Sequence, residues 1–254
     1  MRYLTHTRSV LVIAALAAPG ASFAQELSGS VGAGAIYLPK YLGADENETR
    51  FYPAIDLSYG DDFYLSTTQG LGWNAWRGRN WTLSPFIGYT FGRDNDDKLS
   101  GMDEVDGSFT AGLRYALQYD PNWSFYASAQ APFTGDVDGF ELSTGAVWSN
   151  RLAERWVVSL SPSVTYSSEN WTDSLFSVSG RESARSGVRA YDADNGYLRF
   201  GINGSLSYFI SRELSVTAFA GVTRLTGEAK DSSIVDDIGD ATQAYGGGFV
   251  SYHF

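Results

Sequence analysis

Apolar and polar residues alternate with a period of two along most of the chain. Between Trp81 and Phe91, apolar side chains occupy every second position, and the positions between them hold mostly serine, threonine and glycine. Because the side chains of a strand point alternately to its two faces, this pattern predicts strands with one apolar and one small, polar face. The pattern predicts strands over residues 27–38, 51–59, 63–76, 81–92, 107–119, 123–133, 140–149, 156–166, 198–210, 214–225 and 245–254.

The small polar face decides between two kinds of β protein. A soluble β-sandwich would expose that face to water, where we expect more lysine and glutamate than serine, threonine and glycine. A face of small residues fits a confined interior. Strands of about ten residues with alternating hydrophobicity, separated by turn residues, are typical of transmembrane barrels. The sequence therefore predicts an all-β fold, a closed antiparallel transmembrane β-barrel, with a soluble sandwich as the alternative.

The number of strands is ambiguous near the amino terminus. Eleven segments alternate, but a barrel with both ends of the chain in the periplasm needs an even number of strands. Residues 63–76 could fold back near Gln69 and Gly70 as two short strands, which gives twelve. Alternatively, one early segment lies outside the barrel, which gives ten. We predict twelve strands, closed by pairing of the first strand with Tyr245–Phe254.

The connections predict the orientation in the membrane. Four are short, and three of these are bracketed by Trp or Tyr, residues that favour the membrane–water boundary. Three others are long and acidic, over residues 93–106, 167–195 and 226–241. Outer-membrane barrels have short periplasmic turns and long outer loops. The bracketed turns are therefore predicted to face the periplasm, and they follow Trp76, Tyr119 and Trp148.

Residues 1–24 have the features of a secretory signal peptide. Arg2 and Arg8 precede an unbroken apolar run over residues 10–18, and small residues stand at Ser22 and Ala24. Nine apolar residues are too few for a spanning helix, which needs about twenty. We predict cleavage after Ala24, which leaves residues 25–254 as one outer-membrane barrel domain in a Gram-negative cell.

Composition narrows the partners. Without the signal peptide, the chain has 16 Lys and Arg against 29 Asp and Glu. This balance argues against nucleic acid, which needs clustered basic residues. There is no cysteine, so disulfides and thiolate chemistry are excluded. The expected partners are the lipid of the outer membrane and its lipopolysaccharide.

Candidate catalytic, cofactor-binding and metal residues were sought, and none is predicted. His253 is the only histidine after the signal peptide, and its position predicts a residue of the periplasmic rim rather than a general base. The acids Asp94, Asp96, Asp97, Asp103 and Glu104 fail the spacing of an EF-hand, because Leu99 and Val105 stand where glycine and glutamate are needed. They predict a solvated acidic loop. A second hypothesis is that this loop shares divalent cations with the phosphates of lipopolysaccharide.

Four charged residues stand at strand positions that are predicted to face the lumen, namely Asp56, Arg114, Glu141 and Arg199. These charges predict a paired network in the lumen rather than a selectivity ring.

The loops, more than the strands, resemble those of the MipA/OmpV family of outer-membrane proteins. The resemblance covers nearly the whole chain after the signal peptide, with Ala44, Ser177 and Ser233 departing from the usual residues. It rests on an ordered set of residues: Pro39, Tyr41, Gly43, Pro53, Gly92, Arg93, Leu99, Gly101, Phe176, Val178, Ser186, Gly187, Tyr191, Ala193, Gly196, Arg224, Leu225, Gly227, Ala229, Ser232, Ile234, Val235, Gly239 and Phe254.

The resemblance implies an outer-membrane barrel without catalytic residues. The family's namesake is regarded as a scaffold that links a murein hydrolase to a murein synthase, and other members are linked to adhesion, solute uptake or antibiotic susceptibility. The resemblance therefore implies a protein that is not an enzyme and that has one of two functions. One is a scaffold for periplasmic murein hydrolase and synthase enzymes. The other is a passive channel for small solutes, or an adhesin that acts through its outer loops.

Overall fold

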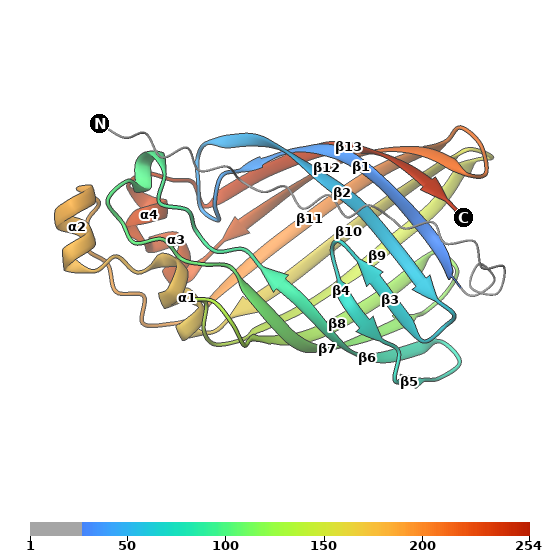
Figure 1. The fold of residues 1–254 in the computed structure, drawn as a ribbon, viewed down its shortest axis with the longest axis horizontal. Coiled ribbons are helices and arrows are strands. Elements are labelled where there is room, and N and C mark those ends of the chain that lie inside the picture. Colours follow the sequence, from blue (N-terminus) through green and yellow to red (C-terminus); the bar gives the residue numbers. More distant parts are fainter. Residues whose placement is uncertain (1–26) are drawn as a thin grey trace, which may run out of the picture.

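The predicted strands form one antiparallel sheet that closes on itself (Figure 1). The computed structural model describes residues 27–254, so the predicted signal peptide lies outside the described residues. The strands are β1 Leu27–Pro39, β2 Asn47–Tyr59, β3 Phe63–Ser66, β4 Gly70–Trp73, β5 Trp76–Arg77, β6 Trp81–Thr90, β7 Ser108–Gln118, β8 Trp123–Pro132, β9 Glu141–Ala153, β10 Trp156–Ser167, β11 Tyr197–Phe209, β12 Leu214–Leu225 and β13 Thr242–His253.

Closure takes place at two seams. At the first, β1 pairs with β13 from Ser30 opposite His253 to Tyr37 opposite Gly246. At the second, β4 pairs with β6 through only two residue pairs. The two-residue strand β5 also pairs with β6, nearer to the start of β6 than β4 does. The barrel therefore has twelve strands, with β5 as a short addition, and both the closed fold and the predicted twelve are confirmed.

The additional pair of strands comes from the predicted fold-back of residues 63–76. β3 and β4 have four residues each and are joined by a polar tip at residues 67–69. Gly70 has a φ of +76°, a conformation that favours glycine, and a Cβ at this position would lie 2.0 Å from the carbonyl oxygen of Ile87. Glycine at position 70 is therefore needed both for the turn and for the close approach of β6.

Large apolar side chains cover the outside of the barrel. Phe51 is 85% exposed, and the outward rings of other strands are also exposed, as expected for a surface that lipid covers. The lumen-facing side is less uniformly small than the sequence predicts. Phe219 and Phe249 stack there with ring centroids 5.6 Å apart, and the ring of Phe249 occupies the space beside Gly34.

Within residues 27–254, helices occur only in the connections at one end of the barrel. These are α1 Glu169–Phe176, α2 Gly180–Ser186, α3 Gly227–Asp231, α4 Ser233–Asp236 and the 3-10 turn η1 Asp97–Leu99. No helix within residues 27–254 is long and apolar enough to cross a membrane. We term this end, at the left of Figure 1, the outer end, and the end with the short turns the periplasmic rim.

Candidate functional site

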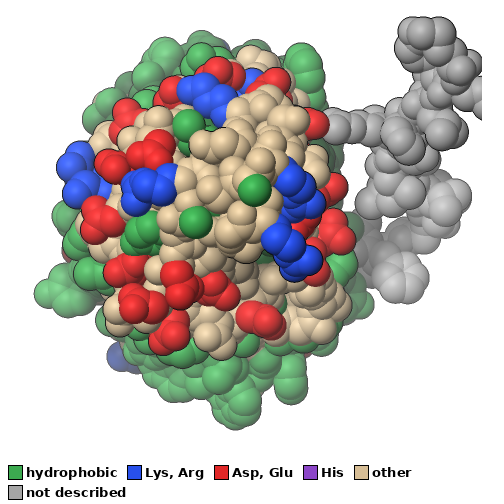
Figure 2. Space-filling view, turned by 90° about the vertical axis from the view of Figure 1, so that its left-hand side faces the viewer, with side chains coloured by type: hydrophobic (Ala, Val, Ile, Leu, Met, Phe, Trp, Pro, Cys, Tyr) green, Lys and Arg blue, Asp and Glu red, His purple; other side chains and the backbone are tan. Residues whose placement is uncertain are grey.

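The outer connections pack together into a cap over the outer end of the barrel. The cap consists of residues 40–46, 91–107, 133–140, 168–196 and 226–241, which lie between successive strands. Seen along the barrel in Figure 2, backbone and side chains fill this end, with acidic and basic side chains scattered over it. The sequence predicted these long connections but not that they fold into one body.

The cap contains the apolar core of the molecule. One cluster of buried side chains surrounds Trp171 and Phe176 of α1, and a second surrounds Leu99 and Ile234. Trp171 is 1% exposed, and the ring of Phe176 packs edge-on against Tyr197 with centroids 5.5 Å apart. Burial of large apolar side chains contributes about 1.5–3 kcal/mol each relative to exposure. Apolar burial therefore holds the cap together, whereas backbone pairing holds the barrel together.

Residues that carry the family resemblance meet in these two clusters. Phe176, Ala193, Leu225, Ala229 and Val235 belong to the first cluster, and Leu99, Val178 and Ile234 belong to the second. The resemblance in the loops is therefore a resemblance in the packing of the cap.

Local features explain why the cap segments take these conformations. At the start of α2, the hydroxyl of Ser179 accepts a hydrogen bond from the backbone of Glu182, and the Glu182 side chain accepts one from the Ser179 backbone. This reciprocal capping box satisfies two free N–H groups. Gly187 ends the helix in the left-handed conformation. Gly43 has a φ of +100°, and a Cβ there would lie 2.6 Å from Val235.

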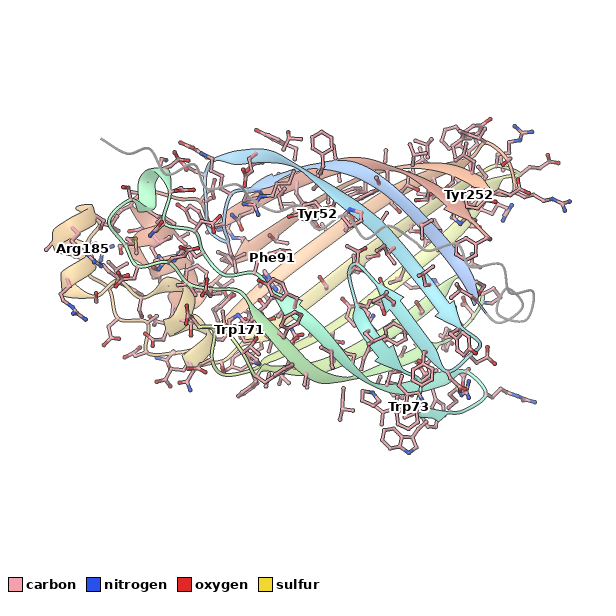
Figure 3. The ribbon with its side chains drawn as sticks, viewed as in Figure 1. Tyr52, Trp73, Phe91, Trp171, Arg185 and Tyr252 are labelled. Carbon is pink, nitrogen blue, oxygen red and sulfur yellow. The ribbon has the colours of Figure 1, made fainter. Side chains whose placement is uncertain are left out.

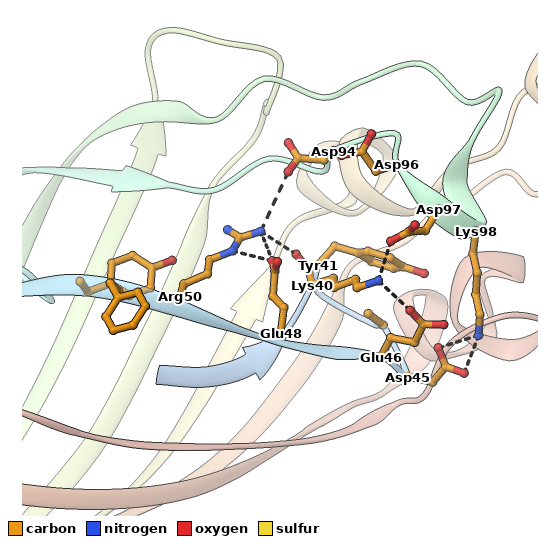
Figure 4. A pocket seen from close by; sticks show the side chains of 13 residues that line it. Lys40, Tyr41, Asp45, Glu46, Glu48, Arg50, Asp94, Asp96, Asp97 and Lys98 are labelled. Carbon is orange, nitrogen blue, oxygen red and sulfur yellow. Dashed lines mark hydrogen bonds and ion pairs between the residues drawn. The ribbon is translucent and has the colours of Figure 1, made fainter. Parts of the chain in front are cut away.

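Ion pairs fasten the connection after β6 to the connection after β1 (Figure 4). Lys40 lies 2.5 Å from Asp97 and 2.7 Å from Glu46, and Lys98 lies 2.6 Å from Asp45. Hydrogen bonds to these carboxylates raise the pKa of Lys40. All of these side chains are partly exposed, and such pairs each contribute about 0.2–1 kcal/mol. We term the Lys40–Asp97 and Lys98–Asp45 contacts the outer ion pairs.

Some of the acidic residues between Asp94 and Glu104, which the sequence predicted to be solvated, form ion pairs with basic side chains. Asp103 lies 2.7 Å from Arg185, and Asp94 lies 4.0 Å from Arg50 of β2. Among the described residues, no three His, Asp or Glu side chains are grouped so that they could hold a metal ion. Asp97 and Asp103 are therefore exposed partners of ion pairs between loops, and Asp94 lies near a basic side chain of the barrel wall.

Arg93 and Tyr41 are polar groups buried in the cap. Burial lowers the pKa of Arg93 and raises the pKa of Tyr41 to about 12. Neither the Nε of Arg93 nor the hydroxyl of Tyr41 has a hydrogen-bond partner among the described residues. Glu182 is also buried, which raises its pKa, but hydrogen bonds from Ser179 and Asp103 and the charge of Arg93 reverse the shift, and the net pKa is lowered.

The four charges predicted in the lumen behave differently from one another. Glu141 accepts hydrogen bonds from Gln130 and Ser167 and lies 3.6 Å from Arg199, as expected for a paired network. The guanidinium of Arg114 lies over the ring of Tyr126, 4.2 Å from its centroid. Asp56 forms no ion pair with another residue of the described range, and it is exposed in the lumen next to β3.

His253 lies at the periplasmic rim on the lumen-facing side, where the sequence placed it. The structure adds Ser215, whose hydroxyl is 2.7 Å from Nε2 of His253. The ring of His253 also lies beside that of Phe209, with centroids 5.4 Å apart.

A cavity of about 640 Å³ lies beneath the cap. Trp171 and Leu175 of α1 form its outer end, and lumen-facing residues of β9, β11, β12 and β13 form its back wall, among them Glu141, Arg199, Thr223 and Tyr245. Its near side includes Tyr52 of β2 together with Thr90 and Phe91 at the end of β6. Figure 3 shows Tyr52, Phe91 and Trp171 in this part of the molecule. The alternation of apolar and polar positions did not predict this cavity.

Comparison with known proteins agrees with the fold. A family model described as MltA-interacting protein MipA matches residues 31–254. The MltA-interacting protein of Escherichia coli K12 is 29% identical over 202 residues, which cover 74% of this chain and 77% of that protein. A protein of Escherichia coli O157:H7 named outer membrane protein YiaT is 29% identical over 238 residues, 90% of this chain and 92% of that protein.

Among solved structures, the NanC porin has a similar fold. The TM-score is 0.52 at 7% sequence identity, and the match covers 89% of this chain and all of the porin chain. At this identity the likeness concerns the barrel fold alone. Together with the names of the relatives, it assigns the chain to the outer membrane as a β-barrel protein.

Proposed function

Because this chain belongs to the MltA-interacting protein MipA family, we propose that it is a scaffold that holds a murein hydrolase at its periplasmic rim. The relative in Escherichia coli K12 is named for an interaction with MltA. The observation that carries the proposal is the difference between the two ends of the barrel. A packed apolar core closes the outer end, whereas two segments of the periplasmic rim, which we term the projecting segments, expose a large apolar side chain next to arginine.

The first projecting segment is the hairpin between β9 and β10. β9 continues to Ala153, beyond the Asn150 that the sequence marked as the start of a turn, and only two residues connect it to β10. Leu152 is 62% exposed at this tip, and Arg151 and Arg155 flank it. An exposed leucine between two arginines is a suitable contact for a partner with an apolar and acidic surface.

The second projecting segment is the stretch from Asn74 to Asn80, which contains β5. It is held in place by the turn between β2 and β3, because Asn74 donates a hydrogen bond to the carbonyl of Asp61 at 2.8 Å. Arg77 pairs with Asp62 at 2.5 Å. Trp76 in this segment is 54% exposed. The segment therefore presents an aromatic and basic surface in a fixed position.

The size of a specific interface explains why both segments would be needed. A stable interface buries about 800 Å² on each partner, and a turn of a few residues offers only a fraction of that area. The two segments lie on different parts of the sheet, since β6, β7 and β8 separate β5 from β9. A partner that contacts both would lie across the periplasmic mouth of the barrel.

Cysteine cross-linking in cells tests the proposal. The chain has no cysteine, so Leu152→Cys and Arg79→Cys each introduce a single reactive site at the rim. Both variants are expected to cross-link to a murein hydrolase of the MltA type through a short thiol-to-amine reagent. Lys230→Cys, in the cap, is the matched control and should give no such product. The scaffold proposal is lost if neither rim variant gives a murein enzyme while both variants remain folded.

A second function, passage of small solutes, is favoured by the cavity of about 640 Å³ beneath the cap. Barrels of this strand number range from side-chain-filled to ligand-holding, and clear aqueous pores belong to larger barrels. Conductance in planar bilayers separates the two functions. We expect no steady current from the wild-type protein, because Trp171 and its neighbours close the outer end. A steady single-channel current would favour passage of solutes.

A further inference from the structure

The barrel wall is incomplete on one side. β2 has thirteen residues, but β3 pairs with it only from Asp56 to Tyr59. On the other side of the hairpin, β4 pairs with β6 only at Ile87 and Phe86. The outer part of β2 and the outer end of β6 therefore have no strand between them, as Figure 1 shows to the left of the β3–β4 hairpin. We term this gap the wall opening.

The edge of β2 at the wall opening is only partly protected. Thr67 exchanges hydrogen bonds with Ile55, whose N–H lies 2.9 Å from the Thr67 hydroxyl, and Pro53 has no N–H to satisfy. Because backbone groups alternate along a strand, those of Phe51 and Thr49 point to the same edge, and no strand pairs with it there. Irregular or unpaired backbone at membrane depth is tolerated only where it lines protein or a water-filled cavity.

The wall opening lies beside the cavity beneath the cap. Its inner edges are Tyr52 on β2 and Thr90 on β6, which both line that cavity together with Thr223 of the back wall. Its outer edges are aromatic, because Phe51 is 85% and Phe91 is 64% exposed. The opening therefore joins the lipid-facing surface to the lumen.

The height of the opening corresponds to the outer leaflet. Strands of four residues extend about 13 Å, and less along the membrane normal because barrel strands are tilted, whereas the apolar band of such a barrel is about 25 Å tall. The β3–β4 hairpin extends from the periplasmic rim, where β3 begins and β4 ends, so the two strands cover less than half of that band. The polar tip at residues 67–69 ends at this depth, which fits a hydrated opening.

The outer side of the opening is acidic. A second cavity, of about 700 Å³, adjoins the first and shares Tyr52, Arg50 and Asp94 with it (Figure 4). Six carboxylates and three basic side chains line it, namely Asp45, Glu46, Glu48, Asp94, Asp96 and Asp97 with Lys40, Arg50 and Lys98. The excess of carboxylates repels anions, and aromatic edges attract cations as well as alkyl chains.

We propose that the wall opening admits single-chain cationic amphipaths from the outer leaflet into the cavity beneath the cap. The alkyl chain lies between the aromatic edges formed by Phe51 and Phe91, and the cationic head group stays near the carboxylates of the outer cavity. The anionic head groups of the outer leaflet concentrate such molecules at this depth. The outer ion pairs bound the opening on its outer side and connect its two edges.

Reaction of a single cysteine on the back wall tests this proposal in the full protein, reconstituted in vesicles that contain lipopolysaccharide. Thr223→Cys is treated with a methanethiosulfonate reagent that carries a twelve-carbon chain and a trimethylammonium group. Two matched reagents are an anionic one with the same chain and a trimethylammonium reagent without the chain. The cationic long-chain reagent is expected to react at least tenfold faster than either.

A second substitution identifies the route. Thr90→Trp adds a large ring at the inner edge of the opening, and in the Thr223→Cys background it should slow the long-chain cationic reagent about tenfold and leave the chainless reagent unchanged. Equal rates for the two cationic reagents would show access along the barrel axis and overturn the proposal. Equal rates for the cationic and anionic chains, or no effect of Thr90→Trp, would also overturn it. Gln243→Cys, which lines the same cavity, replaces Thr223→Cys if that variant does not fold.

Discussion

The cap and the barrel wall are stabilised in opposite ways. In the wall, large apolar side chains such as Phe51 face outward and the backbone pairing of neighbouring strands supplies the cohesion. In the cap, Trp171 and Phe176 are buried as in a soluble protein, and charged side chains are scattered over the surface. One chain therefore contains a membrane protein and a small soluble fold. The difference indicates that each can be disrupted while the other persists.

Trp171→Ala is expected to have the largest effect on the cap while leaving the barrel wall intact. Removing a buried tryptophan costs about 3–5 kcal/mol, and here the loss falls on the cap alone. Hydrogen exchange should become faster in residues 168–196 and 226–241, while the strands remain protected. A closed barrel that resists unfolding is expected to migrate differently on gels before and after heating, and the variant should keep this gel shift. Trp156→Ala, on the lipid-facing surface, is the control and should leave the cap unchanged. Loss of the gel shift in Trp171→Ala would mean that cap and wall unfold together.

A smaller effect in the same direction is expected from Gly43→Ala. Gly43 has a φ of +100°, and an added Cβ would lie 2.6 Å from Val235. Backbone strain of this kind costs about 1–3 kcal/mol. Cap exchange should rise less than in Trp171→Ala. Gly60→Ala is the matched control in the wall, because Gly60 also has a positive φ, of +56°, but open space around it. Its effect should be confined to the turn between β2 and β3.

Acid should loosen the cap through Glu182 before it affects the wall. The folded-state pKa of Glu182 is lowered relative to an unfolded-state value of about 4.3. Its stabilisation is therefore complete above that value and is lost as the pH falls through the folded-state pKa. Exchange in residues 179–187 should increase as the pH falls below about 4.3. Glu182→Gln should raise exchange at neutral pH and remove this pH dependence, and an unchanged profile in that variant would exclude Glu182 as the cause.

The smallest effect is expected at the outer ion pairs. Lys98→Met removes a contact of 2.6 Å to Asp45 between side chains that are more than a third exposed. Such a pair contributes about 0.2–1 kcal/mol, and salt screens it. Cap exchange in this variant should differ from the wild type at low ionic strength and match it at high ionic strength. A salt-independent difference would point to lost packing by the lysine stem instead.

The sequence predicted the wall much better than the cap. Alternation with a period of two is a direct consequence of strand geometry, so the strands could be predicted from the sequence. The fold-back near Gln69 and Gly70 followed from the even number of strands that such a barrel needs. The wall opening was not predicted, because both proposed strand numbers assumed a wall of uniform height. At the periplasmic rim twelve strands surround the lumen, whereas near the outer end β3 and β4 are absent. Every early segment lies in the sheet, so twelve is the number of strands and the alternative of ten is wrong.

The cap could not be predicted, because its cohesion depends on contacts between distant segments. The helices have only four to eight residues, too few for a clear period of 3.6. Two signals were available: the Ser179 and Glu182 spacing of a capping box, and apolar residues such as Trp171 and Ile234 within connections predicted only to be long and acidic. The partners of Lys40 and Lys98, 57 and 53 residues away, have no signal in the sequence.

The cap is built from five separate connections, so its exposed surface combines residues that are far apart in the sequence. Gln243 donates a hydrogen bond to the carbonyl of Tyr41, 202 residues earlier in the chain, and similar contacts join the other connections. Antibodies or bacteriophages that recognise this surface would therefore bind discontinuous epitopes. Immunisation with synthetic loop peptides should give sera that fail to bind intact cells, whereas immunisation with the refolded protein should succeed.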